Sequence, residues 1–190
     1  TRLLNMCGIG LVNKDDKHAP QIIKAANCEL YTYSEESKEA DFVASDIRYV
    51  SQPDFVGTEF HISGKYDMEV RLGIPGLFNV VNALAAVSVC SFLGLDQARI
   101  SHALENIRVN GRMEIVYTSE RCTVLVDYAH NAVSMESLLS TLRDYKPKRL
   151  VCVFGCGGNR SKDRRYSMGE IGGKMADLSI ITADNSRYEK

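Results

Sequence analysis

The pattern of apolar and polar positions divides the chain into a mixed α/β region followed by a region in which strands and helices alternate. In the first region, short apolar runs stop at turn-forming residues such as Asn13 and Asp15, as strands do. We expect strands at 9–12, 29–33, 42–47, 59–62 and 68–72, and a short helix at 19–26. Gly64 and Lys65 are expected to form the turn between the last two strands.

Two helices are expected to follow. The Ala-rich run from Asn79 to Leu93 is apolar on nearly every side, which favours a helix buried within a domain over a membrane span. After Asp96, a typical N-cap residue, apolar side chains recur at helical spacing and predict an amphipathic helix. These side chains are Ile100, Ala103, Leu104 and Ile107.

From about Val109 the pattern predicts strand, helix, strand, helix, strand. The strands are expected at 122–127, 150–154 and 178–182, and the helices after a cap at Ser134 and over 166–176. Continuous apolar strands in this order indicate a parallel sheet that is covered on both faces, with right-handed crossovers. The sequence therefore predicts the α/β class and two parts, at residues 1–108 and 109–190.

Composition and charge narrow the class of protein. The 190 residues are 45% hydrophobic and 25% charged, which is ordinary for a globular chain. A net charge of -1 argues against nucleic acid as a partner. The six cysteines form no CxxC pair, which predicts a reducing, cytoplasmic compartment and no metal site. We expect both ends to be cuts through a longer protein.

Polar residues follow each strand of the second region, at 127–131, 155–160 and 184–187. Because parallel strands end at one edge of a sheet, these segments are expected to share that edge, where ligands of open α/β sheets bind. The segment Gly155–Arg165 has three glycines at its start and four basic residues against one acidic residue. This composition suits a carboxylate or phosphate ligand, although a solvated basic loop would look the same.

Other polar residues allow both a binding and a structural interpretation. Asp127 and His130 could hold a ribose and a phosphate, or could cap a turn and fill a loop. Asp184 and Arg187 could form only a surface ion pair. An Asn pair three residues apart, at 79 and 82, could recognise an adenine edge or cap its helix.

Taken together, these residues resemble the Mur ligases, and among them the branch that adds the third amino acid of the peptidoglycan stem peptide, the MurE type. The matching stretches are GLVNKDD at 10–16, GLFNVVNALAA at 76–86, NGRMEIV at 110–116, VDYAHN at 126–131, FGCGGNRSKDRRYSMG at 154–169 and TADNSRYE at 182–189. They cover nearly the whole chain in the order of the family.

The resemblance implies that the chain is the rear half of a central ATPase domain joined to the front half of a Rossmann-like C-terminal domain. It implies an ADP-forming ligase of cell-wall synthesis that uses ATP and Mg²⁺. The substrates would be UDP-N-acetylmuramoyl-L-alanyl-D-glutamate and an amino acid, with meso-diaminopimelate favoured over L-lysine. A cyanophycin or folylpolyglutamate synthetase-like ligase and a non-catalytic nucleotide-binding module are the alternatives.

The resemblance also assigns roles to single residues. On the nucleotide side it implies Asn79, Asn82, Arg112, Asp127 and His130. On the amino-acid side it implies Arg160, Asp184, Asn185, Ser186 and Arg187, with Ser186 standing where the family has proline. No GxxxxGK[ST] occurs, so the phosphate-binding loop and the modified lysine are expected in the remainder of the protein, and these 190 residues are expected to be inactive alone.

Overall fold

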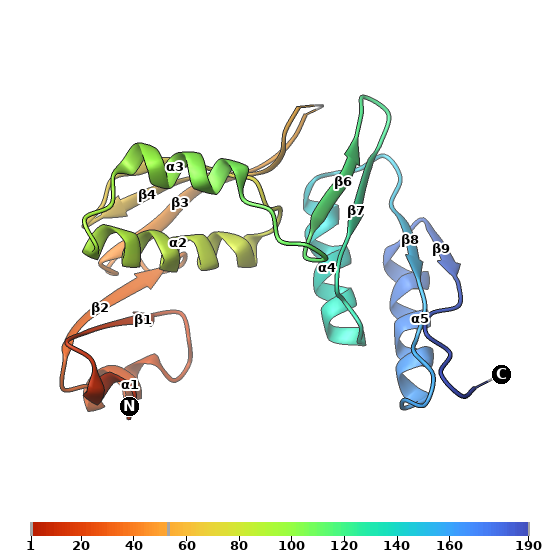
Figure 1. Cartoon of the computed structure of the whole chain (residues 1–190), viewed down its shortest axis with the longest axis horizontal. Helices are drawn as coiled ribbons and strands as arrows, with labels where there is room; N and C mark the ends of the chain where they lie inside the picture. The colour runs from red at the N-terminus through yellow and green to blue at the C-terminus, as the bar shows by residue number, and fades with distance from the viewer. Residues whose placement is uncertain (1, 53, 190) are drawn as a thin grey trace. The chain divides into compact units, whose positions relative to one another are not determined.

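The computed structural model describes residues 2–52 and 54–189 and divides into two compact units. Unit 1 comprises Thr1–Asn110 with Glu114–Val124, and unit 2 comprises Gly111–Met113 with Leu125–Lys190. Figure 1 shows the order of the elements along the chain. Among the described residues, the helices are too short or too polar to cross a lipid bilayer.

Five strands of the described chain form the sheet of unit 1, in the order of the sequence. Strands β1, β2 and β3 pair in parallel, whereas β3, β4 and β5 pair antiparallel. The strands are β1 (Ile9–Asn13), β2 (Glu29–Ser34), β3 (Phe42–Ser51), β4 (Val56–Gly64) and β5 (Met68–Leu72), and η1 (Leu4–Met6) and α1 (Ala19–Ala25) complete this part. The predicted strands and the short helix are confirmed.

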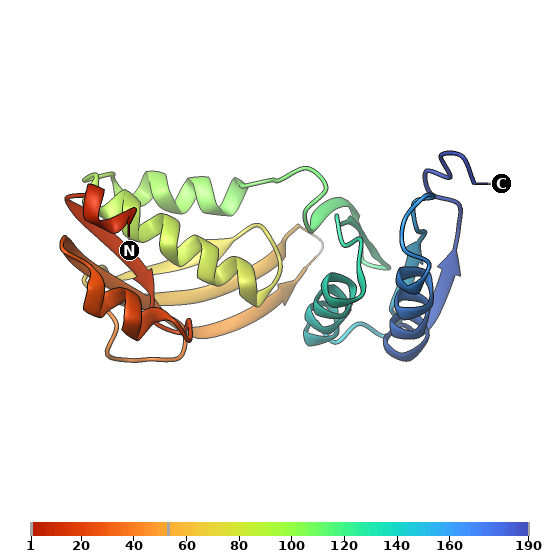
Figure 2. The same ribbon diagram turned by 90° about the horizontal axis from the view of Figure 1, so that it is seen from below.

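The core of unit 1 lies between this sheet and the helices α2 (Leu77–Phe92) and α3 (Gln97–Asn106), which lie on the same side of it in Figure 2. Alternate residues of β4 and β5, such as Phe60, Ile62 and Val70, are buried against Leu84 and Leu104 of the helices. The predicted N-cap of α3 is confirmed, because Oδ1 of Asp96 accepts a hydrogen bond from the Arg99 amide at 3.1 Å.

Helix α2 corrects two predictions. Its N-cap is Gly76, at a φ of 106°, and neither Asn79 nor Asn82 caps it. Only one face of the helix is buried, because Phe78 and Val89 are 44% and 47% exposed. An Ala-rich pattern does not tell these faces apart, since small apolar side chains tolerate both solvent and core.

Helices and strands alternate in the remainder of the chain. The elements are β6 (Glu114–Thr118), β7 (Thr123–Val126), α4 (Ala132–Asp144), β8 (Val151–Phe154), α5 (Asp163–Met175) and β9 (Leu178–Ile181). Strands β8 and β9 pair in parallel, as predicted. Strand β7 was expected in the same sheet and instead pairs with β6, a strand that the pattern did not predict.

The small parallel sheet is covered on one face only, which corrects the expectation of two covered faces. Cys152 and Phe154 of β8 pack with Met135 and Met168 of α4 and α5. The alternate residue Val153 is 61% exposed. The side chains of a strand point to opposite faces in turn, so a run of apolar residues can be half exposed.

The cap of α4 also differs from the prediction. Asn131 is the N-cap, and its Oδ1 accepts the Ser134 amide at 2.9 Å. The Ser134 hydroxyl accepts the Asn131 amide at 3.3 Å in return, so the two side chains form a capping box. The helix therefore begins three residues earlier than a cap at Ser134 would place it.

Asp177 ties four elements of unit 2 together. Its Oδ2 accepts Nη1 of Arg143, at the end of α4, at 3.0 Å and the Leu150 amide, just before β8, at 2.6 Å. Arg143 also donates from Nε and Nη2 to the last carbonyl of α5, that of Met175. The hydrogen bond from Arg143, followed by that from Leu150, holds the pKa of Asp177 below its ordinary value.

We therefore expect Asp177→Asn to destabilise the chain at neutral pH and to matter little in acid. A carboxyl whose folded-state pKa is lowered stabilises the fold above its unfolded-state pKa of about 3.9, and this contribution disappears as the pH falls through the lowered value. Urea unfolding of both proteins at about pH 7 and at about pH 3 measures the difference. A deficit of equal size at both pH values would contradict a charge-based role.

Candidate functional site

Strands β8 and β9 bring two polar segments of the chain to one edge of their sheet. The strands pair in register from Val151 with Leu178 to Phe154 with Ile181. The pairing continues one step beyond, since the Thr182 amide donates to the Phe154 carbonyl at 3.0 Å. The two segments that follow, 155–160 and 183–187, therefore start side by side, as the parallel order predicted.

Two glycines allow these segments to touch. A Cβ atom at Gly155 would lie 2.5 Å from the Thr182 carbonyl oxygen, and one at Gly158 would lie 1.9 Å from the Ser186 carbonyl oxygen. Both distances are far below van der Waals contact, so only glycine fits. The buried Gly158 also donates its amide to the Asn185 carbonyl at 2.8 Å.

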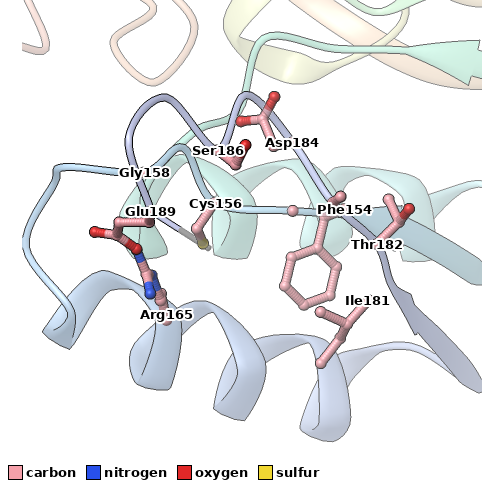
Figure 3. A pocket seen from close by; sticks show the side chains of 11 residues that line it. Phe154, Cys156, Gly158, Arg165, Ile181, Thr182, Asp184, Ser186 and Glu189 are labelled. Carbon is pink, nitrogen blue, oxygen red and sulfur yellow. The ribbon is translucent and has the colours of Figure 1, made fainter.

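A cavity of about 250 Å³ lies between the two segments and the start of α5. Its lining residues are Phe154, Gly155, Cys156, Gly158, Arg165, Ile181, Thr182, Ala183, Asp184, Ser186 and Glu189. Figure 3 shows the Arg165 and Glu189 side chains pointing toward one another, and Phe154 and Ile181 lying together farther along the cavity. A small cavity with an apolar part and a few charged groups has the character of a ligand site.

The predicted amino-acid-side residues are gathered here but do different things. Asp184 and Ser186 line the cavity. Arg160 and Arg187 are exposed. They follow lining residues closely in the sequence but do not line the cavity themselves. Asn185 supports the segment, because its Oδ1 accepts the Arg187 amide at 3.1 Å.

The segment at Ser186 is held in place by hydrogen bonds rather than by proline. The Asn185 side chain closes a turn onto Arg187, and the Ser186 carbonyl accepts the Glu189 amide at 3.0 Å. Asx turns of this kind constrain the backbone as a substitute for a fixed φ. The turn is therefore formed without the proline that the family resemblance implies at position 186.

Sequence reasoning missed the ion pair of Arg165 with Glu189. Nη2 of Arg165 donates to Oε2 of Glu189, and Oε1 of the same carboxylate accepts the Asn159 amide at 2.8 Å. These two hydrogen bonds, that from Arg165 foremost, lower the pKa of Glu189. The available signal was weak, since Arg165 was only one of several basic residues and Glu189 lies outside the predicted segments.

The segment after β7 forms a second cluster. Oδ1 and Oδ2 of Asp127 accept the amides of Ala129 at 2.8 Å and Met113 at 2.9 Å. The guanidinium of Arg112 lies 4.5 Å from the centroid of the Tyr128 ring. The ring of His130 lies 4.9 Å from that of Tyr128, and its Nδ1 is 3.1 Å from the Tyr128 carbonyl oxygen.

This cluster brings together Arg112, Asp127 and His130, three of the residues predicted on the nucleotide side. It contributes none of the residues that line the cavity. Only two of the three predicted segments therefore contribute to the lining. Tyr128 was not predicted to have a role. An aromatic residue just after a predicted strand was the available signal in the sequence, and in the structure its side chain is 58% exposed.

The two remaining nucleotide-side residues lie on α2 in unit 1. Nδ2 of Asn79 donates to the Pro75 carbonyl at 2.7 Å, and Nδ2 of Asn82 approaches Oδ1 of Asn79 at 3.5 Å. Asn79 is half-buried and Asn82 exposed. Residues 2–52 and 54–189 contain no group of three His, Cys, Asp or Glu side chains that could hold a metal ion.

Two models of known protein families match the chain. A family model described as the Mur ligase middle domain matches residues 1–90, and one described as Mur ligase, glutamate ligase domain, matches residues 111–190. The chain belongs to the Mur ligase family. The predicted resemblance and the α/β fold class are confirmed.

Two curated relatives of this Mur ligase chain share a name. The UDP-N-acetylmuramoyl-L-alanyl-D-glutamate--2,6-diaminopimelate ligase of Alkaliphilus oremlandii is 40% identical over 97% of this chain and 38% of its own length. Ligase 2 of that name from Clostridium acetobutylicum is 38% identical over 100% of this chain and 38% of its own length. The chain thus spans about 38% of the length of these curated relatives.

Solved structures agree on the fold of this Mur ligase chain. A structure of a ligase with the same name has a TM-score of 0.73 and 31% identity, over 100% of this chain and 40% of that one. A folylpolyglutamate synthase from Thermotoga maritima has a TM-score of 0.66 at 19% identity, covering 92% of this chain and 47% of that one. Likeness to the latter shows the shared fold alone.

The close approach at Gly158 gives a stability test in this Mur ligase chain. We expect Gly158→Ala to cost about 1–3 kcal/mol of unfolding free energy, because the new Cβ would push the Ser186 carbonyl away. Gly157→Ala is the matched control, since its Cβ would meet its nearest neighbours at 3.7 Å and should change stability by less than about 0.5 kcal/mol. Urea unfolding measures both, and equal effects would refute the packing argument.

Proposed function

We propose that this chain is part of an ATP-dependent amide ligase of peptidoglycan precursor synthesis in the cytoplasm. The ligase would join meso-diaminopimelate to UDP-N-acetylmuramoyl-L-alanyl-D-glutamate. Residues 1–108 would be the rear of its central ATP-binding domain, and residues 109–190 the front of its amino-acid-binding domain. The shared name of relatives 38–40% identical over nearly the whole chain supports this proposal.

The observation that carries the proposal is the meeting of two segments with exposed arginines at the β8–β9 edge. Arg160 follows β8 and Arg187 follows β9, and the backbones of their segments are bonded through Gly158 and Asn185. Guanidinium groups bind carboxylates in a bidentate manner. Meso-diaminopimelate has a second carboxylate that L-lysine lacks, so two arginines favour the diacid.

The proposed reaction has two steps. A carboxylate oxygen of the UDP-linked dipeptide attacks the γ-phosphorus of ATP, which releases ADP and forms an acyl phosphate. The amino group of the incoming amino acid then attacks the acyl carbon, loses a proton and displaces inorganic phosphate. Arg160 and Arg187 would bind the carboxylates of the amino acid and so orient its amino group, which is catalysis by positioning.

The residues that we propose for the nucleotide form two separate groups, the Tyr128 cluster in unit 2 and the asparagines of α2 in unit 1. Each oxygen of Asp127 accepts one backbone amide and retains a lone pair that can accept a ribose hydroxyl. Arg112 supplies a positive charge, and His130 a second polar group beside the same ring. The amides of Asn79 and Asn82 can pair with the donor and acceptor edge of adenine.

The described residues contain no group of three His, Cys, Asp or Glu side chains that could hold a metal ion, so they form no site built from protein ligands alone for the Mg²⁺ that the family resemblance implies. We propose that its ligands lie in the remainder of the protein, and we derive no step through the metal ion from this chain. The same division applies to the phosphate-binding loop, because no GxxxxGK[ST] occurs in the sequence.

We expect Arg187→Ala in the complete ligase to raise KM for meso-diaminopimelate about 10- to 100-fold, which corresponds to the loss of a charge-assisted hydrogen bond. KM for ATP should change less than about twofold, because the nucleotide residues lie elsewhere. Arg121→Ala, which removes an exposed arginine between β6 and β7, is the control. Steady-state kinetics with meso-diaminopimelate and L-lysine, side by side, measure the effect, and equal losses for both amino acids would remove the specificity argument.

The 190-residue chain alone should release no ADP from ATP in the presence of both substrates. The reason is that the phosphate-binding loop is not among its residues. A coupled assay for ADP, with the complete ligase as the positive control, measures this. Measurable amide formation by the isolated chain would show that the assignment of the missing parts is wrong.

A further inference from the structure

The carboxylate of Glu189 links two segments that each carry one of the proposed substrate arginines. Oε2 accepts Nη2 of Arg165, on the first turn of α5, and Oε1 accepts the amide of Asn159 at 2.8 Å. Oδ1 of Asn159 accepts the Tyr188 amide at 3.2 Å in the opposite direction. We name Asn159, Arg165, Tyr188 and Glu189 the Glu189 clamp.

The clamp lies next to both arginines in the chain. Arg160 follows Asn159 directly, and Arg187 precedes Tyr188. Asn159 and Arg187 have φ values of 54° and 52°, in the left-handed region, which Asn tolerates and which costs energy for Arg. Such a conformation persists only where the surroundings impose it, and such strain is often found at binding sites. Here the clamp bonds are made by Asn159 itself and by Tyr188, the neighbour of Arg187.

The charges of the clamp are matched within the protein. Arg165 and Glu189 are about one-third exposed, at 37% and 33%, so the pair borders the cavity without lying in open solvent. The pKa of Glu189 is lowered, so its carboxylate is ionised at neutral pH and pairs with the guanidinium. With Arg165 paired in this way, Arg160 and Arg187 are the exposed arginines of the two segments.

We propose that Glu189 and Arg165 are positioning residues of the amino-acid site. Their ion pair and the Asn159 bonds set the distance between Arg160 and Arg187, so that both guanidinium groups meet the carboxylates of one incoming diamino diacid. Neither Glu189 nor Arg165 contacts the amino acid. The inference rests on the proposed function and adds the part of the fold that sets the geometry of the site.

A competing role for Glu189 would have the opposite effect on KM for the amino acid. In that role, Arg165 itself would bind a substrate carboxylate, and the Glu189 carboxylate would compete with the substrate for Arg165. Removing the charge of Glu189 would then lower KM for the amino acid. If Glu189 positions the segments, the same change raises KM. The sign of the change therefore separates a positioning residue from a competing one.

The experiment compares Glu189→Gln with Glu170→Gln in the complete ligase. Glu170 pairs with Lys174 on the exposed side of α5, so the control makes the same chemical change in an ion pair of the same helix outside the cavity. We expect Glu189→Gln to raise KM for meso-diaminopimelate about tenfold and to leave KM for ATP within about twofold. The reciprocal variant Arg165→Glu/Glu189→Arg restores an ion pair but removes the acceptor of the Asn159 amide, so it should recover only part of the loss.

Hydrogen–deuterium exchange of the same proteins, without substrates, gives a readout independent of ligation. Peptides that contain the amides of Asn159 and Tyr188 should exchange faster in Glu189→Gln and at an unchanged rate in Glu170→Gln. The reason is that loss of the charged pair with Arg165 loosens residue 189, which accepts the Asn159 amide, and with it the bond from the Tyr188 amide to Asn159. Faster exchange together with a higher KM for the amino acid supports the proposal.

In the kinetic experiment, an unchanged or lowered KM for the amino acid would overturn the proposal, and so would an equal rise in KM for ATP. Either leaves the proposed function standing as long as the unaltered ligase uses meso-diaminopimelate. If the unaltered ligase uses no amino acid, the proposed function fails instead, and exchange still reports whether the clamp exists. An unchanged exchange of both peptides would also overturn the proposal.

Discussion

The parallel pairing of β8 and β9 is the constraint on which the candidate site depends. Because Phe154 and Ile181 end their strands in register, two chain segments that lie far apart in the sequence begin next to one another. Gly155 and Gly158 then let their backbones approach to distances that any Cβ would prevent. The cavity, the turn at Ser186 and the Glu189 clamp all follow from this one contact between two loops.

Much of this could be predicted from the pattern of apolar residues. Runs such as 150–154 and 178–182 are short, β-rich and bounded by polar residues, so both the strands and their parallel order could be predicted. The pairing partner of β7 could not, because periodicity marks a strand without naming its neighbour. The strand at Glu114–Thr118, half exposed and short, lacked a strong pattern and was missed.

Single side-chain contacts were the least predictable part of the site. Arg165 and Glu189 are separated by most of α5 and by β9, so only the folded chain brings them together. Likewise, Asn131 caps α4 where Ser134 was expected. Both residues belong to one capping box, so the sequence alone does not tell which of them is the N-cap. Ser186 lacks the ring of proline, and the bond from the Arg187 amide to the Asn185 side chain compensates in a way that a motif does not reveal.

The most direct test of the account is a crystal structure of the complete ligase with its amino acid bound. The account predicts that the amino acid lies at the β8–β9 edge, with its carboxylates within hydrogen-bonding distance of Arg160 and Arg187. It also predicts that Glu189 remains bound to Arg165 and to the Asn159 amide. An amino acid bound elsewhere, or at this edge without contact to either arginine, would contradict it.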